Sequence, residues 1–387
     1  MQQKKKGFNH VKLLLILIGA VVIVNILAVV FQKISERTGA INLCDVYIEY
    51  VFAFFVNVFS AIISIFPFSV GEILILVGIA LLLIWIVVGI LFAIFKEKYN
   101  IKKCAKTYSL FMAYVITCVS IVMTLNCTLL YRASYLNVKD VPDDREYSIV
   151  ELRILRNYIV DKCNEYCDKV VRDEDGDIVY DDDINQNAKQ YLRNLSDVYE
   201  RLDGFYPDMK PMKFSNIMTQ SYICGYYFPF SLEANYNDLM YIPNLPSTFC
   251  HELAHIKGYI YEDEASFLSY LACINSEDIF FTYSGYLNVL YYVDSAYYNA
   301  LSDENKEEYF EQPVIKEQVD FDNQFVLEEV FKEVEDNSII KTEDMDSISD
   351  GFMDITLKIN GVEDGKISYS RVVGLLLKYY DGVLYYE

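Results

Sequence analysis

An uncharged apolar run near the N-terminus sets the first limit on the fold. Leu13–Phe31 contains 19 residues without a charged side chain, and Lys4, Lys5, Lys6 and Lys12 precede it. A run of this length can cross the hydrocarbon core of a bilayer as a helix. No small-residue cleavage site follows it, so we interpret it as an anchor and not as a removed signal peptide.

Two further uncharged runs have the composition of membrane spans, and a fourth run is harder to place. We expect spans at about 13–31, 73–95 and 107–131. If the fourth run, Tyr50–Phe66, also crossed, the Lys-rich loop at 96–106 would lie opposite the Lys-rich N-terminus. That arrangement contradicts the preference of Lys and Arg for cytoplasmic loops.

Three spans place both basic clusters in the cytoplasm and everything after Tyr131 outside it. The fourth run also carries a stripe of small or polar residues at helical spacing, namely Ala53, Asn57, Ser60 and Ser64. We therefore predict an interfacial helix at about 46–66 that lies on the outer surface of the bilayer. The chain is predicted to be a multi-pass cell-membrane protein whose N-terminus is cytoplasmic and whose C-terminal domain is extracytoplasmic.

Charge divides the chain at the same place. Residues 1–131 hold 11 Lys and Arg and five Asp and Glu, whereas the rest of the chain holds 22 and 50. We predict a membrane anchor at 1–131 and an acidic outer domain at 132–387. The excess of acidic groups argues against a nucleic-acid partner, because phosphates would be repelled. The nine cysteines lack the paired spacing of a disulfide framework or a Cys-type zinc site.

The outer domain is expected to be mostly helical with a small sheet. Amphipathic periodicity predicts helices at 148–171 and 184–203 and several more after position 263. Met212–Met218 and Ser221–Phe228 have the composition of short strands, and Pro229 favours an edge position for the second. The fold class expected is therefore three transmembrane helices followed by a mostly helical α+β domain with an edge-strand sheet.

The motif that carries chemistry is HELAH at 251–255. On a helix His251 and His255 project from one face, so both imidazoles can reach one cation. Glu252 stands beside the first ligand, where a carboxylate can take a proton from a water molecule that the metal activates. This pattern predicts a zinc site with Glu252 as the general base.

A catalytic zinc usually has a third protein ligand. His10 lies beside the first span, so the third ligand must be a carboxylate, and Glu262, Asp263 and Glu264 follow the Gly258 turn. Apolar residues at helical intervals from Glu264 place it on a buried face, which favours Glu264 as the ligand. Glu262 and Asp263 stay open as alternative ligands or as groups that orient a ligand histidine.

A donor for the tetrahedral oxyanion is also needed, and the histidine count leaves a tyrosine as the substitute. Tyr222, Tyr226, Tyr286 and Tyr291 lie near the motif or on the expected edge strand. With 34 tyrosines in the chain, each of them is more often a packing residue than a catalytic one.

Taken together, these segments resemble an uncharacterised family of bacterial membrane proteins, a domain of unknown function. The resemblance covers nearly the whole chain and rests on PFSVGE (67–72), YICGYYFPFSLEAN (222–235), HELAH (251–255), EDEASFLSYLAC (262–273) and INGVEDGKISYSRVVGLLLKYY (359–380). It implies a three-span anchor that carries a zincin-like, gluzincin-like outer domain. The EDEA element is similar to the ExEA helix that supplies the third ligand in other HExxH peptidases, which matches Glu264. The gap from His255 to Glu264 is much shorter than in thermolysin-like enzymes, so their fold and oxyanion residues do not carry over.

Two functions fit this sequence. The first is a membrane-anchored zinc-dependent metallopeptidase that hydrolyses a peptide or protein substrate. The second is a non-catalytic metal-binding sensor or scaffold in the membrane. A structural site gains nothing from the Glu252 carboxylate beside an open coordination position, which favours the enzyme.

Overall fold

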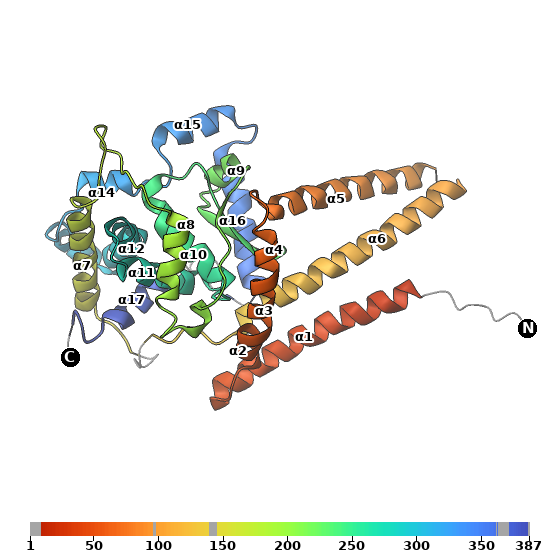
Figure 1. Ribbon diagram of the computed structural model, residues 1–387, viewed down its shortest axis with the longest axis horizontal. Coiled ribbons are helices and arrows are strands. Elements are labelled where there is room, and N and C mark those ends of the chain that lie inside the picture. The colour runs from red at the N-terminus through yellow and green to blue at the C-terminus, as the bar shows by residue number, and fades with distance from the viewer. Residues whose placement is uncertain (1–8, 96–97, 139–144, 361, 363–370, 386–387) are drawn as a thin grey trace, which may run out of the picture. The chain divides into compact units, whose positions relative to one another are not determined.

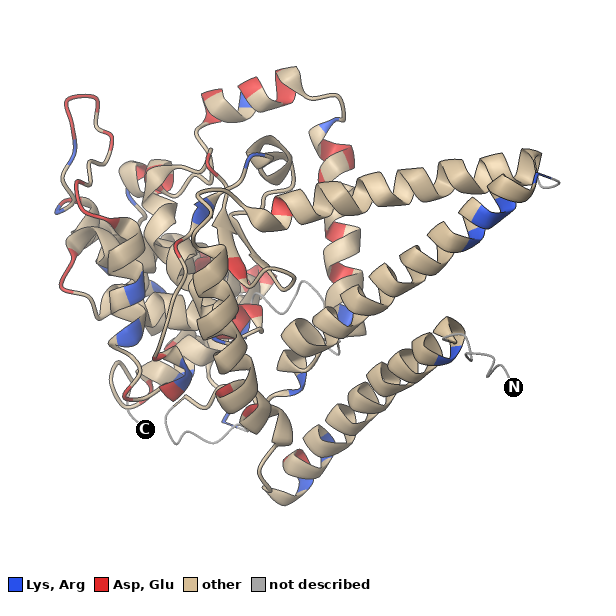
Figure 2. Cartoon of the chain, turned by 45° about the vertical axis from the view of Figure 1, so that its right-hand side comes forward, with Lys and Arg blue, Asp and Glu red and all other residues tan. Residues whose placement is uncertain are grey.

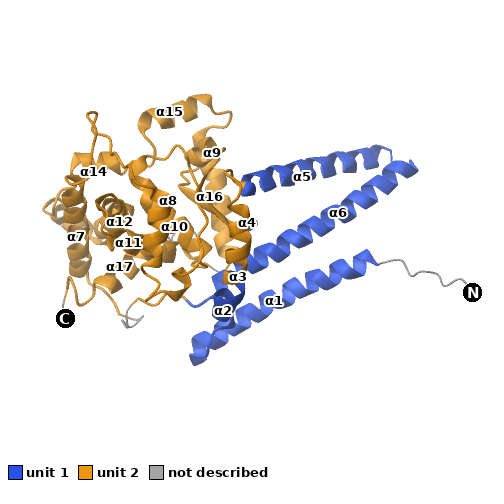
Figure 3. Cartoon of the chain, viewed as in Figure 1, with its two compact units in different colours: residues 1–52, 70–134, 229–231 blue, residues 53–69, 135–228, 232–387 orange. Residues whose placement is uncertain are grey.

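The structure is a computed structural model that describes the whole chain except residues 1–8, 96–97, 139–144, 361, 363–370 and 386–387 (Figure 1). Contacts between residues divide the chain into two compact units (Figure 3). Unit 1 comprises residues 1–52, 70–134 and 229–231, and unit 2 comprises 53–69, 135–228 and 232–387. Segment 53–69, expected to belong with the anchor, groups with unit 2.

Unit 1 is built from long apolar helices. These are α1 (His10–Thr38), α5 (Val70–Ile94) and α6 (Tyr99–Met123), the last continuing as the π-helical turn η3 (Thr124–Thr128). Their charged side chains lie only near the helix ends (Figure 2), which leaves apolar stretches long enough to cross a bilayer. Polar contacts join them inside the unit: the Asn25 amide donates to Thr124, and the Trp85 indole donates to Ser109.

The helix between α1 and α5 is also long and apolar. It runs through α2 (Leu43–Val46), η1 (Tyr47–Phe52), α3 (Ala53–Phe55), η2 (Val56–Ser60) and α4 (Ala61–Ile63), of which η1 and η2 are π-helical. By length and composition the described chain therefore has four candidate spans where three were expected, and Leu43–Ile63 is the addition. The boundary between the two units falls inside this helix, after Phe52.

Unit 2 is mostly helical, as expected. Its longer helices are α7 (Ile149–Cys167), α8 (Ile184–Arg193), α10 (Leu245–Ile256), α11 (Glu262–Ile274), α12 (Ile279–Ala300), α15 (Glu328–Asn337), α16 (Thr342–Ile359) and α17 (Val372–Tyr380). The shorter ones are α9 (Ser215–Gln220), α13 (Glu307–Phe310) and α14 (Glu317–Asp322).

The main hydrophobic core of unit 2 lies between α7, α11, α12 and α17 (Figure 1). Helix α7 illustrates how the sequence forms one wall of this core. Ser148 and Glu151 form a capping box at its start, which satisfies two backbone donors. Leu155, Ile159 and Cys163 then follow at intervals of four and are fully buried, so one face of the helix enters the core.

A three-stranded sheet completes unit 2. Its order is β1 (Lys210–Pro211), β3 (Glu233–Tyr236) and β2 (Gly225–Phe228), with β1 parallel and β2 antiparallel to the central β3. The expected second strand is thus present in shortened form, and it is an edge strand. The expected strand at 212–218 is wrong, because Ser215–Gln220 forms α9, which buries Ser215, Met218 and Thr219 at helical and not alternate spacing.

Candidate functional site

The two histidines of the motif lie on α10, and local sequence sets the limits of that helix. Pro246 stands in its first turn, where a missing N–H costs nothing. Gly258 ends it with a φ of 87°, a conformation that suits glycine. Between these limits His251 and His255 fall one turn apart on one face, and their Nε2 atoms are 3.1 Å apart.

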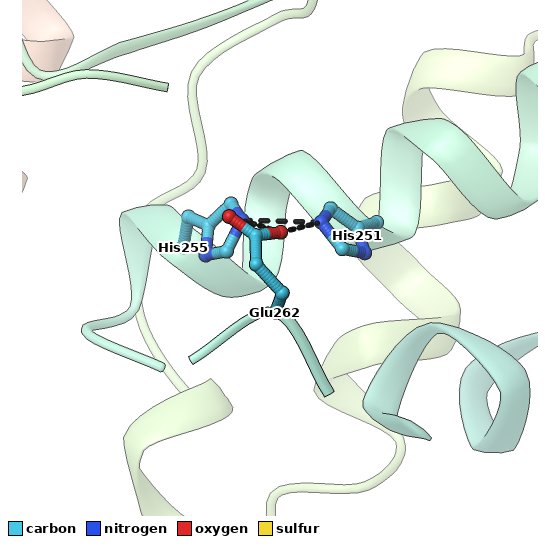
Figure 4. A group of neighbouring side chains, drawn as sticks. All are labelled: His251, His255 and Glu262. Carbon is cyan, nitrogen blue, oxygen red and sulfur yellow. Dashed lines mark hydrogen bonds and ion pairs between the residues drawn. The ribbon is translucent and has the colours of Figure 1, made fainter. Parts of the chain in front are cut away.

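The third member of the cluster is Glu262, the first residue of α11. Its Oε2 lies 3.1 Å from Nε2 of His251 and 3.4 Å from Nε2 of His255. Figure 4 shows the carboxylate pointing at both imidazoles from the neighbouring helix. In the part of the chain that the structure describes, this is the one group of three or more His, Cys, Asp or Glu residues with ligand atoms close enough to hold a metal ion.

The other ring nitrogens of both histidines are already engaged. Nδ1 of His255 donates to the Tyr259 carbonyl at 2.7 Å, and Nδ1 of His251 lies 3.2 Å from the Ser266 hydroxyl. Such contacts are typical of ligand histidines, because they fix the tautomer and the ring orientation. Because Nδ1 of His255 donates to the Tyr259 carbonyl, its Nε2 is the nitrogen that faces His251 and Glu262.

The spacing of these atoms fits zinc. Two ligands of a tetrahedral zinc with bonds of about 2.0–2.1 Å lie about 3.3–3.4 Å apart. The three separations in the cluster, from 3.1 to 3.4 Å, come close to that value. Two imidazoles and one carboxylate are also a known donor set for catalytic zinc, one that leaves a fourth position open.

The structure brings Glu262 to the two histidines, and not Glu264, the residue that the sequence favoured as third ligand. The Glu264 carboxylate accepts the Leu136 N–H at 2.5 Å and is not among the residues of the cluster. Burial raises the pKa of Glu264 to about 8, a poor match for an anionic ligand. Asp263 is also engaged elsewhere, since it accepts from the Tyr135 hydroxyl and pairs with Arg371 at 3.1 Å. These two acids hold the start of α11, whereas Glu262 alone of the three reaches the histidines.

Glu252 is buried beside the cluster. Its Oε2 has no hydrogen-bond partner among the described residues, and burial raises the pKa of its carboxyl to about 8. The edge strand β2 comes very close: a Cβ on Gly225 would lie 2.5 Å from Cγ of Glu252. Any side chain at position 225 would therefore displace the Glu252 side chain, against which the strand lies.

The charges of the cluster are strongly coupled. Burial lowers the pKa of His251. Burial also disfavours protonation of His255, but the charge of Glu262 and its hydrogen bond outweigh this and raise the pKa to about 9. The pKa of Glu262 is held well below its usual range, because the two histidines more than offset its burial. Glu262 is thus an anion at neutral pH, which is the state a metal ligand needs.

The four tyrosines singled out in the sequence occupy different environments. Tyr286 is buried in the core with its hydroxyl 3.3 Å from that of Tyr158, and the Tyr291 hydroxyl donates to Asp320. Tyr222 stacks on Phe331, and Tyr226 is exposed on β2. None of these contacts is with the histidines or with Glu262.

A fifth tyrosine, Tyr292 on α12, lies nearer the cluster and was not anticipated. Burial, with the charges of Cys224 and Glu262 nearby, raises its pKa to about 12. The sequence held a signal for it: Gly285 lets α12 approach α11 so closely that an added Cβ would meet Cys273 at 2.5 Å. Two helical turns later on the same face of α12 stands Tyr292. Because α11 and α12 are consecutive and antiparallel, that position lies toward the start of α11.

Comparison with known proteins gives the family and no activity. A family model described as "Protein of unknown function (DUF3810)" matches residues 47–377, so the chain belongs to this family. No curated protein and no solved structure matches the chain. Membership in a family of unknown function was expected from the sequence and is confirmed.

The close approach of β2 to Glu252 predicts a stability change. In Gly225→Ala the new Cβ overlaps the Glu252 side chain, and we expect the free energy of unfolding to fall by about 1–3 kcal/mol. Gly374→Ala, inside α17 with nothing within 4 Å, should instead gain about 0.5–1 kcal/mol. Denaturant unfolding of the full chain in detergent micelles measures both. A Gly225→Ala protein as stable as the parent would contradict the contact.

Proposed function

We propose that this member of the DUF3810 family is a membrane-anchored zinc-dependent metallopeptidase. The observation that carries the proposal is the convergence of Nε2 of His251, Nε2 of His255 and Oε2 of Glu262 within 3.4 Å of one another. The buried carboxylate of Glu252 beside them, whose Oε2 has no hydrogen-bond partner among the described residues, supports catalysis over a purely structural site. The zincin-like character of unit 2 is part of this proposal.

His251, His255 and Glu262 would hold the metal. Zinc, when bound, supplies a Lewis acid that polarises water and the carbonyl of the scissile bond. Glu252 accepts a proton from the attacking water and delivers it to the leaving nitrogen. A carboxyl pKa raised toward neutrality by burial suits both steps, because the group can then take and give a proton near pH 7.

The Tyr292 hydroxyl is proposed to donate to the oxyanion that forms on the substrate carbonyl. Its position on the face of α12 toward α11 and its electrostatic link to Glu262 support this role. The pKa of about 12 keeps the hydroxyl protonated at neutral pH, so it remains a donor. Tyr286, with its hydroxyl in the core, is dropped from the candidates.

The orientation predicted from the lysines belongs to the same proposal. Apolar helices near the N-terminus could span a membrane. With Lys-rich ends in the cytoplasm, unit 2 would act on the outer face, where the substrate is a peptide or protein of the cell envelope.

The central test replaces Glu252 by Gln, which keeps the shape but cannot carry a proton. In the purified full chain we expect unchanged zinc content, measured by plasma mass spectrometry. Hydrolysis of a random peptide library should fall by about 10²–10⁴-fold. If wild type and Glu252→Gln retain zinc and behave alike, the alternative of a metal-binding sensor or scaffold replaces the enzyme. Absence of zinc from both rejects the metal site.

A second test separates the two glutamates of α11. Glu262→Gln should lower zinc affinity by at least about tenfold, because the neutral amide is a weak ligand. Glu264→Gln is the matched control: its amide oxygen can still accept the Leu136 N–H, and zinc affinity should stay near that of the parent. Competition titration with a chelating dye measures both. The opposite ranking would restore Glu264 as the ligand.

A third test compares adjacent tyrosines. Tyr292→Phe should lower kcat by about 10²–10³-fold with KM and zinc content little changed, as expected for a donor that acts in the transition state. Tyr291→Phe, whose hydroxyl is held by Asp320, serves as the control and should keep its activity. Equal rates for the two variants would remove Tyr292 from the mechanism.

A further inference from the structure

Segment 53–69 of unit 2 has two unlike sides. Along the helical part Val56 and Ser60 are buried almost completely. The opposite side is apolar and exposed, and we call it the aromatic face: its members are Phe54, Phe59, Ile62, Ile65, Phe66 and Phe68. Such a face on a water-soluble protein would be costly, since each of these side chains is more than a third exposed.

The buried side is bound to the soluble body by polar contacts. The Ser60 hydroxyl donates to the Leu232 carbonyl at 2.6 Å, and the Phe205 N–H donates to the Asn57 side chain at 3.2 Å. A helix that crossed the bilayer along this stretch would have to carry the sheet and its loops into the hydrocarbon. Polar groups satisfied by a soluble domain are instead what a helix on the membrane surface requires.

An ion pair and two hydrogen bonds hold the C-terminal end of the segment against the sheet. Lys210 of β1 donates to the Ile63 carbonyl at 3.0 Å and pairs with Glu233 of β3 at 2.9 Å, both charges being buried. Ser69 donates to the other oxygen of Glu233 at 3.1 Å. This ion pair closes the segment onto the sheet one residue before α5 begins at Val70.

The same contacts lead to the histidine–glutamate cluster. Lys257, two residues after His255, donates to the carbonyls of Asp203 and Phe205 at 2.6 and 2.8 Å, and that loop also contacts Asn57. On the other side, β3 pairs with β2, whose Gly225 meets Glu252. Segment 53–69 is therefore connected to the proposed site by two routes. The loop at 203–205 joins it to Lys257, and the sheet joins it to Gly225 beside Glu252.

From these contacts we infer that segment 53–69 lies in the membrane–water interface with the aromatic face in lipid, so that the site acts on peptides tethered to the bilayer. The occupant is lipid because the segment runs directly into α5, an uninterrupted apolar helix long enough to span, and so cannot leave the surface. The substrate class rests on the proposed function; the interfacial position does not.

The interfacial position has a test that needs no activity. The chain has one tryptophan, Trp85 on α5, so Trp85→Phe provides a clean background for a tryptophan at position 54 or 62. In a spanning helix these positions differ in depth by about 12 Å. In the interface both should lie at the same shallow depth, as measured by fluorescence quenching with lipids brominated at different carbons. Unequal depths overturn the inference and leave the zinc site untouched.

Controls for depth are present in the chain. Wild-type Trp85 should report a depth inside the hydrocarbon. A tryptophan at Phe310, which is 75% exposed on unit 2, should escape quenching.

The substrate class is tested in proteoliposomes of the full chain. A peptide from the library that wild type hydrolyses is compared with the same peptide joined to a lipid anchor through a short spacer. We expect roughly a tenfold or greater gain on tethering, because the surface raises the effective concentration. Phe59→Asp, which places a charge in the aromatic face, should move the site away from the lipid and reduce this gain while keeping the rate on free peptide, whereas Phe310→Asp should keep both.

Equal rates on free and tethered peptide would reject the substrate class while leaving the peptidase in place. No hydrolysis of either would reject the peptidase and the substrate class, and the depth measurement would still decide the interfacial position.

Discussion

In unit 2, Nε2 of His251, Nε2 of His255 and Oε2 of Glu262 face one another, and each can accept a hydrogen bond. The site is stable only if positive charge offsets their mutual repulsion. Neutral imidazole Nε2 lone pairs and a carboxylate oxygen repel at about 3 Å unless positive charge lies between them. A protonated His255 supplies that charge when no metal is present, which is the state its raised pKa describes. A divalent cation supplies more, at a spacing that tetrahedral coordination also requires. Helix α10 therefore pairs with α11 in a geometry that a cation would stabilise.

How far the sequence predicted this site is best seen from Glu264. Its apolar stripe predicts burial, and Glu264 is buried. The buried residues of α11, however, lie on two faces of the helix. The apolar stripe enters the core, whereas the polar stripe from Glu262 faces α10: Ser266 meets His251, and Ser269 donates to the Ser247 carbonyl. The proposed metal ligand Glu262 lies on the polar stripe, and only the pairing of the two helices shows which face that is.

The long apolar helices α1, α5 and α6 were predictable from the sequence, whereas the position of the helix at Leu43–Ile63 was not. Long uncharged runs identify α1, α5 and α6, because lipid leaves few alternatives to a helix. Leu43–Ile63 has the length and hydropathy of a fourth span, so composition does not decide its position. Its polar residues add information that composition lacks: Asn57 and Ser60 bond to partners in unit 2 that are 148 and 172 residues away in the chain. No local pattern encodes such contacts.

The short sheet links these two features through its register. Strand β1 has two residues and β3 four, too few to fix their alignment by backbone hydrogen bonds alone. The Lys210–Glu233 pair adds specificity, because a slipped register would leave a buried charge without its partner. A slip of one residue on β2 would also set Cys224 or Tyr226 in place of Gly225, and neither side chain fits against Glu252. Strand β3 thus connects the ion pair that holds segment 53–69 with the strand whose Gly225 lies against Glu252.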